Sequence, residues 1–161
     1  SSTDAKNIRD LYISNKNLEA GKKLPEEILL DDELNRKSLL GLINRPTILY
    51  FWSSENRDHM IRSHAKAEKL RQLYPQYTIL DINLDIDKDR WLQTLKEQNF
   101  DDRFSYKFVD KIEELRRDFS INNILKTIIL NEDAIILNAH ANMFSSQFES
   151  EILGYLNNKD L

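Results

Sequence analysis

One short polar segment carries the side chains best suited to acid–base chemistry. Glu55, Asp58 and His59 stand close together, directly before a long helical pattern. An imidazole titrates near neutral pH and can move protons, and a neighbouring carboxylate can fix its orientation. Asn56 is a good helix cap, and Asp58 suits the positive end of a helix dipole. The segment is either a polar site at a helix N-terminus or, in the simpler interpretation that we favour, a solvated helix start.

Spacing argues against a metal centre or a nucleophilic site around this histidine. His59 and His64 are separated by five positions, so they point about 140° apart on a helix. Glu55 and His59 have the better i,i+4 spacing, but two ligands make a weak site. No serine, threonine or lysine stands beside His59 at a spacing that indicates a nucleophile. We therefore expect no metal and no cofactor, and we interpret His64 as a partly exposed helix residue.

An acidic run from Asp85 to Asp89 begins like a calcium-binding loop of the EF-hand type. Such a loop needs glycine at its sixth position and glutamate at its twelfth, where this chain has Arg90 and Lys96. We therefore exclude calcium here. The simpler interpretation is a strand end followed by a helix that Asp87 caps.

Composition excludes several classes of function. The 161 residues suit one domain, and a net charge of -4 gives no basic surface for nucleic acid. No apolar run reaches the roughly 20 residues of a membrane span. The chain has no cysteine, which excludes disulfides, thiol catalysis and cysteine metal sites. Because it begins Ser-Ser without methionine, we expect a piece of a longer protein.

Hydrophobic periodicity predicts a mixed α/β chain with the order β-α-β-α-α-β-β-α after a short first strand. Residues 1–20 are polar and are expected to form an N-terminal extension with a short helix, before a domain spanning 21–161. Residues 99–108 look irregular and aromatic, either pocket lining or core. We expect strands at 27–30, 47–53, 77–84, 126–130 and 134–137, a helical turn at 39–43, and helices at 57–74, 87–98, 109–118 and 145–156.

Four segments resemble the thioredoxin superfamily, and most closely its TlpA/ResA-like thiol-disulfide oxidoreductases. They are GKKLP at 21–25, TILYFWSS at 47–54, YTILDINLDID at 77–87 and INNILKTIILN at 121–131. The resemblance implies a thioredoxin-like fold, in which a central mixed sheet has helices on both faces. It also implies a periplasmic or otherwise extracytoplasmic location, with a tether in the sequence that precedes residue 1.

The chain departs from that family at its chemical centre. The segment from Glu55 to His59 stands where the family has its Cys-x-x-Cys motif, and Leu125 stands where it has a cis-proline. Disulfide exchange needs a thiolate, which no side chain here can form. A cis bond before a residue other than proline costs about 3–4 kcal/mol. We therefore predict a trans bond between Ile124 and Leu125.

Three functions agree with this pattern. The first is a redox-inactive module that binds a protein or an extended peptide, because strand addition needs backbone groups and not thiols. The second is an enzyme with altered, non-thiol chemistry centred on His59. The third is a structural part of a larger protein, related to the oxidoreductases by fold only. The candidate binding surface comprises Trp52, Glu55, Asn56, Arg57, Asp58, His59, Leu125 and Lys126.

Overall fold

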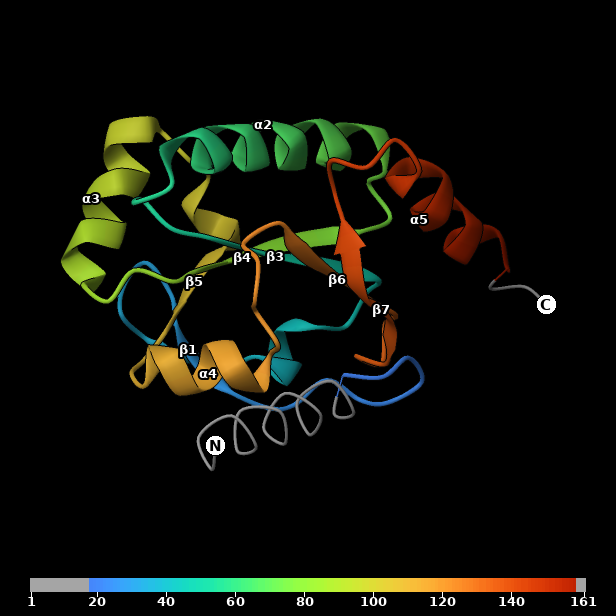
Figure 1. Ribbon diagram of the computed structural model, residues 1–161, viewed down its shortest axis with the longest axis horizontal. Coiled ribbons are helices and arrows are strands. Elements are labelled where there is room, and N and C mark those ends of the chain that lie inside the picture. Colours follow the sequence, from blue (N-terminus) through green and yellow to red (C-terminus); the bar gives the residue numbers. More distant parts are fainter. Residues whose placement is uncertain (1–17, 159–161) are drawn as a thin grey trace, which may run out of the picture.

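The computed structural model describes residues 18–158. The short helix predicted for the N-terminal extension lies outside the described residues. A seven-stranded sheet runs through the molecule in the order β2-β1-β5-β4-β3-β6-β7, with helices on both faces (Figure 1). This arrangement confirms the predicted thioredoxin-like α/β fold.

The sheet is mixed because its central strands pair in both parallel and antiparallel directions. β3 pairs in parallel with β4, and β4 with β5, whereas β3 pairs antiparallel with β6. The strands are β1 (Ile28–Leu30), β2 (Arg36–Ser38), β3 (Thr47–Trp52), β4 (Thr78–Asn83), β5 (Ser105–Phe108), β6 (Lys126–Leu130) and β7 (Ile136–Asn142). The helices are η1 (Leu40–Leu42), α2 (Arg57–Leu73), α3 (Lys88–Gln98), η2 (Asp102–Phe104), α4 (Ile112–Asp118) and α5 (Phe148–Asn157).

Strand β3 lies at the centre of two cores, as its continuous apolar sequence predicts. All of its residues are buried. Tyr50 and Trp52 face the core beneath α2, α3 and α5, whereas Leu49 and Phe51 face the core beneath α4. The two faces alternate because successive side chains of a strand point to opposite sides of the sheet.

The predicted start of α2 is also observed. The Oδ1 atom of Asn56 accepts a hydrogen bond from the backbone N–H of His59 at 3.4 Å, and the helix begins at Arg57. Asp87 caps α3 in the same way, by accepting from the N–H of Asp89 at 2.9 Å. Both caps satisfy backbone donors that the first helical turn leaves without partners.

One predicted element is wrong. Residues 99–108 are irregular only in their first part, because 105–108 form β5, a strand inside the sheet. Its alternate residues Ser105 and Lys107 are polar yet buried, so the segment lacks the apolar run that marks a central strand. The edge strand β2 was not predicted either, since Arg36–Ser38 is polar and too short to show a period.

Candidate functional site

Strand pairing brings the two halves of the predicted surface to the same end of the sheet. Tyr50 of β3 lies opposite Thr127 of β6 in an antiparallel pair. Continuing this register places Leu125 opposite the end of β3, where the chain leaves toward residues 53–56. No peptide bond between described residues is cis, so the predicted trans bond before Leu125 is confirmed.

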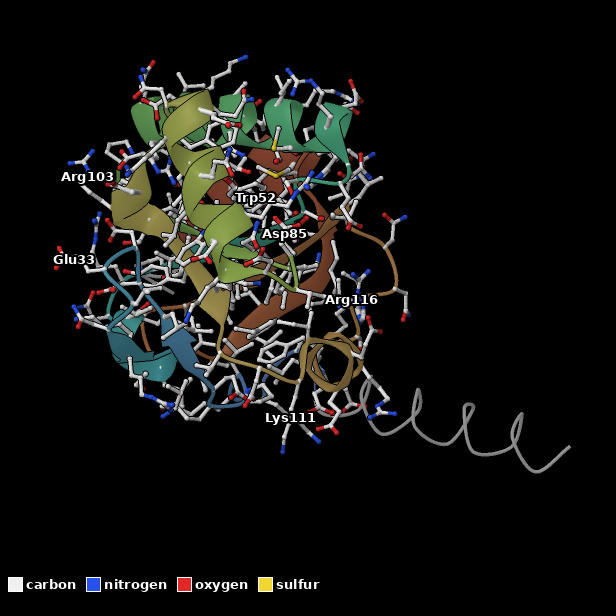
Figure 2. The ribbon with its side chains drawn as sticks, turned by 90° about the vertical axis from the view of Figure 1, so that its left-hand side faces the viewer. Glu33, Trp52, Asp85, Arg103, Lys111 and Arg116 are labelled. Carbon is white, nitrogen blue, oxygen red and sulfur yellow. The ribbon has the colours of Figure 1, made fainter. Side chains whose placement is uncertain are left out.

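A buried carboxylate holds the loop that follows β3. Asp85 accepts hydrogen bonds from Ser53 Oγ at 2.7 Å, from the N–H of Ser54 at 3.1 Å and from Asn83 Nδ2 at 3.0 Å. Figure 2 shows Asp85 close to Trp52 in the interior. The acidic run that resembles a calcium loop therefore has a structural use, which is to position the start of α2.

Four consecutive residues of the predicted surface are open to water. Glu55, Asn56, Arg57 and Asp58 are all exposed. The Asp58 carboxylate lies 3.6 Å from the guanidinium of Arg62 across one helical turn, a surface pair of small energetic value. These four residues form a charged, accessible rim at the N-terminus of α2.

His59 differs from its neighbours because its side chain is only 6% exposed. Its ring meets that of Phe144 edge to face, with the ring centroids 5.8 Å apart, and Nδ1 has no hydrogen-bond partner. Burial lowers the pKa of His59, and the charge of Arg62 lowers it further, against an opposing effect of Asp58. The His59 ring therefore packs α2 against the segment after β7.

Trp52 is not available on the surface. Its side chain is fully buried, and its indole Nε1 donates to Asp81 Oδ1 at 2.6 Å. Leu125 is half-buried, and its backbone N–H donates to Asn123 Oδ1 at 2.9 Å. The accessible part of the predicted surface therefore runs from the rim at the start of α2 to the loop before β6.

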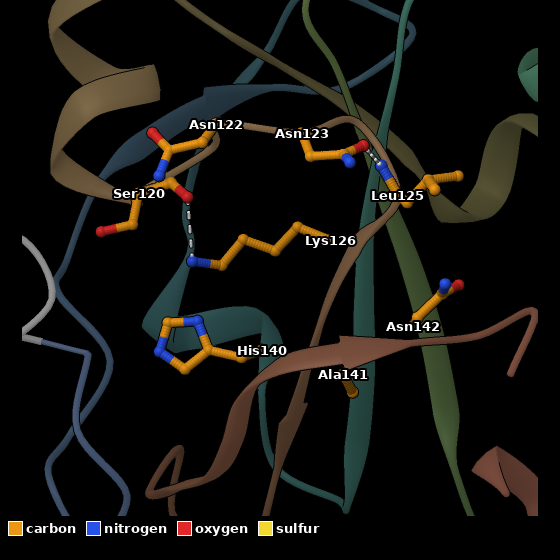
Figure 3. A pocket seen from close by; sticks show the side chains of 8 residues that line it. All are labelled: Ser120, Asn122, Asn123, Leu125, Lys126, His140, Ala141 and Asn142. Carbon is orange, nitrogen blue, oxygen red and sulfur yellow. Dashed lines mark hydrogen bonds between the residues drawn. The ribbon is translucent and has the colours of Figure 1, made fainter.

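Lys126 points away from that rim, to the α4 side of the sheet. Its Nζ donates to the backbone oxygen of Ser120 at 3.0 Å, and burial lowers its pKa to about 8. Figure 3 shows the side chain extending between the Ser120 loop and the ring of His140. The cavity around it measures about 390 Å³ and is lined by Ser120, Asn122, Asn123, Leu125, Lys126, His140, Ala141 and Asn142.

A buried polar cluster lies beneath α2, and sequence reasoning missed it. Asp81 Oδ1 accepts from Trp52 Nε1 and, at 2.6 Å, from Ser105 Oγ. Ser105 Oγ in turn accepts from Trp91 Nε1 at 3.0 Å. His64, predicted to be partly exposed, is half-buried, and its Nε2 lies 3.8 Å from Asp81 Oδ2. The only sequence signal was a charged residue within an otherwise apolar strand.

Comparison with known proteins now identifies the scaffold. A family model described as thioredoxin-like matches residues 44–136. The chain belongs to this thioredoxin-like family.

Solved structures agree with the fold of this thioredoxin-like domain. A proposed thiol-disulfide oxidoreductase from Bacteroides vulgatus has a TM-score of 0.74 and 22% identity, covering 86% of this chain and 97% of that one. The C-terminal domain of a proposed thiol-disulfide oxidoreductase from Bacteroides thetaiotaomicron has a TM-score of 0.71 and 21% identity, with coverages of 88% and 99%. A thiol-disulfide oxidoreductase from Bacteroides fragilis has a TM-score of 0.65 and 23% identity, with coverages of 84% and 99%.

One curated protein also matches in sequence. Toxin B of Clostridioides difficile is 28% identical over 125 residues, which is 78% of this chain but 4% of the toxin. The thioredoxin-like domain thus spans a very small part of that protein's length.

The thioredoxin-like domain has no thiol of its own. The sequence has no cysteine, and Asn56 and His59 act as a helix cap and a packed ring. Within residues 18–158, no group of three or more His, Asp and Glu side chains is arranged to hold a metal ion. No helix in the same range is long and apolar enough to cross a membrane.

Proposed function

We propose that this thioredoxin-like domain is a redox-inactive module that binds an extended segment of a partner protein. The binding surface comprises the exposed rim Glu55–Asp58 and the loop of Ile124 and Leu125. The domain serves as one part of a larger, extracytoplasmic protein. The location rests on resemblance to the oxidoreductase branch alone.

The backbone of Ile124 carries the proposal. Among the described residues it has no hydrogen-bond partner for either its N–H or its C=O, although it is half-buried. Free backbone groups at the entry to a strand are what an added strand requires. The N–H groups of the two residues that follow are already bonded, because Leu125 N–H donates to Asn123 Oδ1 and Lys126 N–H donates to Asn123 O. Ile124 therefore offers both a donor and an acceptor to an added strand.

An enzyme centred on His59 is the weaker alternative. A general base must reach the proton that it abstracts, but His59 is enclosed by Phe144 and the body of α2. Its lowered pKa follows from burial first, which packing alone explains. No observation specifically favours substrate turnover at this ring.

Selection of peptides tests the binding proposal. A phage-displayed library of random peptides is selected on the immobilised domain, and enriched peptides are titrated against the isotope-labelled protein. We expect saturable binding with amide shifts at 55–58 and 124–125. Replacing Ile124→Pro removes the backbone donor and should weaken binding about 5-fold, since one net hydrogen bond contributes around 1 kcal/mol.

The control is Ile124→Val, which keeps the donor and should bind as the parent does. Circular dichroism checks that both variants fold. If no peptide is enriched, or if enriched peptides shift amides elsewhere and bind Ile124→Pro unchanged, the proposed surface is wrong.

Redox inactivity has its own assay. Insulin reduction by dithiothreitol should proceed at the same rate with and without the domain, because thiol exchange requires a thiolate. An acceleration that persists after removal of contaminating thiol proteins would contradict this part of the proposal.

A further inference from the structure

The cavity beside Leu125 (Figure 3) has the composition of an anion site. It holds one buried lysine, Lys126, and one histidine, His140, and the other polar lining groups are hydroxyl and amide side chains. Within this described lining, no residue carries a carboxylate. Most buried charges in proteins are paired, because an unpaired one loses its hydration without compensation.

A second buried lysine shows what is unusual about Lys126. Lys107 also has a pKa lowered to about 8 by burial, but the carboxylates of Asp85 and Asp87 act on it in the opposite direction. For Lys126 burial is the only cause of the shift. Lys107 thus has acidic neighbours within the protein, and Lys126 is left with a neutral carbonyl, that of Ser120.

The polar side chains around the cavity can supply hydrogen-bond donors to an acceptor. Asn123 Oδ1 accepts from the N–H of Leu125, and Asn142 Oδ1 accepts from the N–H of Phe144 at 2.9 Å. Each amide oxygen thus already accepts a hydrogen bond within the protein, so the NH₂ group is the part of the side chain that can donate to a ligand. Ser120 Oγ is buried and has no partner. An ammonium has three donors, of which the Ser120 carbonyl takes one.

We propose that this cavity binds a carboxylate group, contributed by an acidic side chain or the C-terminus of the bound partner segment. The inference rests on the proposed function, because Leu125 belongs both to the cavity lining and to the peptide-binding loop. A single negative charge fits best. Burial and the neighbouring Lys126 lower the pKa of His140, so at neutral pH the ammonium supplies the only formal charge of the lining.

A set of matched peptides tests this inference. An acetylated peptide of alternating alanine and valine is made with a free terminal carboxylate, with a terminal carboxamide, and with an internal glutamate plus carboxamide. Sodium acetate serves as the free carboxylate. Each is titrated by amide chemical shift against the parent, Lys126→Met and Lys107→Met, with folding checked by circular dichroism.

We expect a carboxylate-bearing peptide to bind about 10-fold to 100-fold more tightly than the carboxamide, the range for hydrogen bonds to a charged group. Lys126→Met should remove this preference, and Lys107→Met should retain it. The peptide with the free terminus and the peptide with glutamate distinguish the two sources of the carboxylate.

The outcomes separate this inference from the proposed function. If charged and neutral peptides bind equally to the parent, the carboxylate site is wrong and peptide binding stands. If acetate shifts the amides of Ser120 and His140 in a Lys126-dependent way while no peptide binds, the anion site stands for free carboxylates and the peptide proposal fails. If neither acetate nor any peptide shifts these amides, the inference is overturned.

Discussion

Nε2 of His64 lies 3.8 Å from the carboxylate of Asp81, and both groups are withdrawn from water beneath α2. His64 Nδ1 contacts the backbone oxygen of Met60 at 2.8 Å, so the neutral ring carries its proton on Nδ1 and turns a lone pair toward Asp81. Burial raises the pKa of Asp81 to about 7 and lowers that of His64 to about 4. Arg71 lowers both values. Near pH 5.5 the pair therefore holds one proton, on Asp81.

Because folding raises the pKa of Asp81 and lowers that of His64, the two groups should have opposite effects on how stability changes with pH. Unfolding moves the proton from Asp81, whose ordinary pKa is 3.8, to His64, whose ordinary pKa is 6.5. Between about pH 4.5 and 6.5 the pair binds one proton in either state, so its contribution to the slope of stability against pH is near zero. Single substitutions should reveal the two opposing slopes.

With Asp81→Asn, only His64 remains, and stability should fall as pH decreases from 6.5 to 4 because the unfolded state gains the proton. With His64→Gln, only Asp81 remains, and stability should fall as pH increases from 4 to 7 because the unfolded state loses it. Each slope approaches about 1.4 kcal/mol per pH unit. Urea unfolding of each variant and the parent, followed by tryptophan fluorescence, measures the difference.

The double variant Asp81→Asn/His64→Gln is the control and should again parallel the parent. Other titrating groups are common to all four proteins and cancel in the differences. Two single variants with slopes of the same sign would show that the proton assignment is wrong.

The cap of α2 gives a prediction about stability at the rim. Asn56→Ala removes the acceptor for the N–H of His59 and should destabilise the domain by about 1 kcal/mol. Asn56→Asp retains an acceptor oxygen and should remain within a few tenths of a kcal/mol of the parent. Urea unfolding measures both. If both variants lost the same free energy of unfolding, the acceptor oxygen of residue 56 would contribute nothing to stability.

Cysteines placed at the cap should form a disulfide. In Asn56→Cys/His59→Cys the two residues occupy the cap and the third helical position, which lie close enough to be bridged. Oxidation should lower the intact mass by two hydrogen atoms and abolish labelling by a thiol reagent. In the control Asn56→Cys/Arg62→Cys the second cysteine lies almost one helical turn beyond position 59. Its two thiols are therefore too far apart to bond and should stay reduced. A double variant at 56 and 59 that cannot be oxidised would contradict the placement of this segment at the redox position of the family.

The buried charge of Lys126 should destabilise the folded domain at neutral pH. Its folded pKa of about 8 lies below the ordinary 10.5, so the unfolded state binds the proton more tightly and stability should rise between pH 8 and 10.5. Lys126→Met should therefore be more stable than the parent at pH 7, by about 1–3 kcal/mol. His140 is the other titratable side chain of the cavity lining. Thermal unfolding at pH 7 and pH 10 checks that the advantage shrinks at high pH.

The matched control for this prediction is Lys107→Met. It removes an amine with an equally lowered pKa, but it also leaves Asp85 and Asp87 without their nearby cation, so its gain should be smaller. A Lys126→Met variant less stable than the parent at pH 7 would show that the ammonium is already compensated within the fold.

Local sequence was sufficient where the signal lay within one element. The apolar run of β3 and the Asn56 cap predicted the central strand and the start of α2, because burial on both faces and capping depend on adjacent residues. The absence of cysteine and of proline at Leu125 predicted a trans bond and removed thiol chemistry, since both depend on residue type alone. Strand β5 escaped prediction because its buried polar residues are satisfied by partners distant in sequence.

Residue identity by itself determined that this thioredoxin-like chain has no thiol, which no folding can supply. Tertiary structure alone decided which polar groups lose water. It enclosed His59 and Trp52, which the sequence placed on the surface, and it brought His64 to Asp81 and Lys126 into a cavity without a carboxylate. Burial and charge pairing arise between elements far apart in the chain, so the pKa values and free donors that follow from them become visible only in the folded molecule.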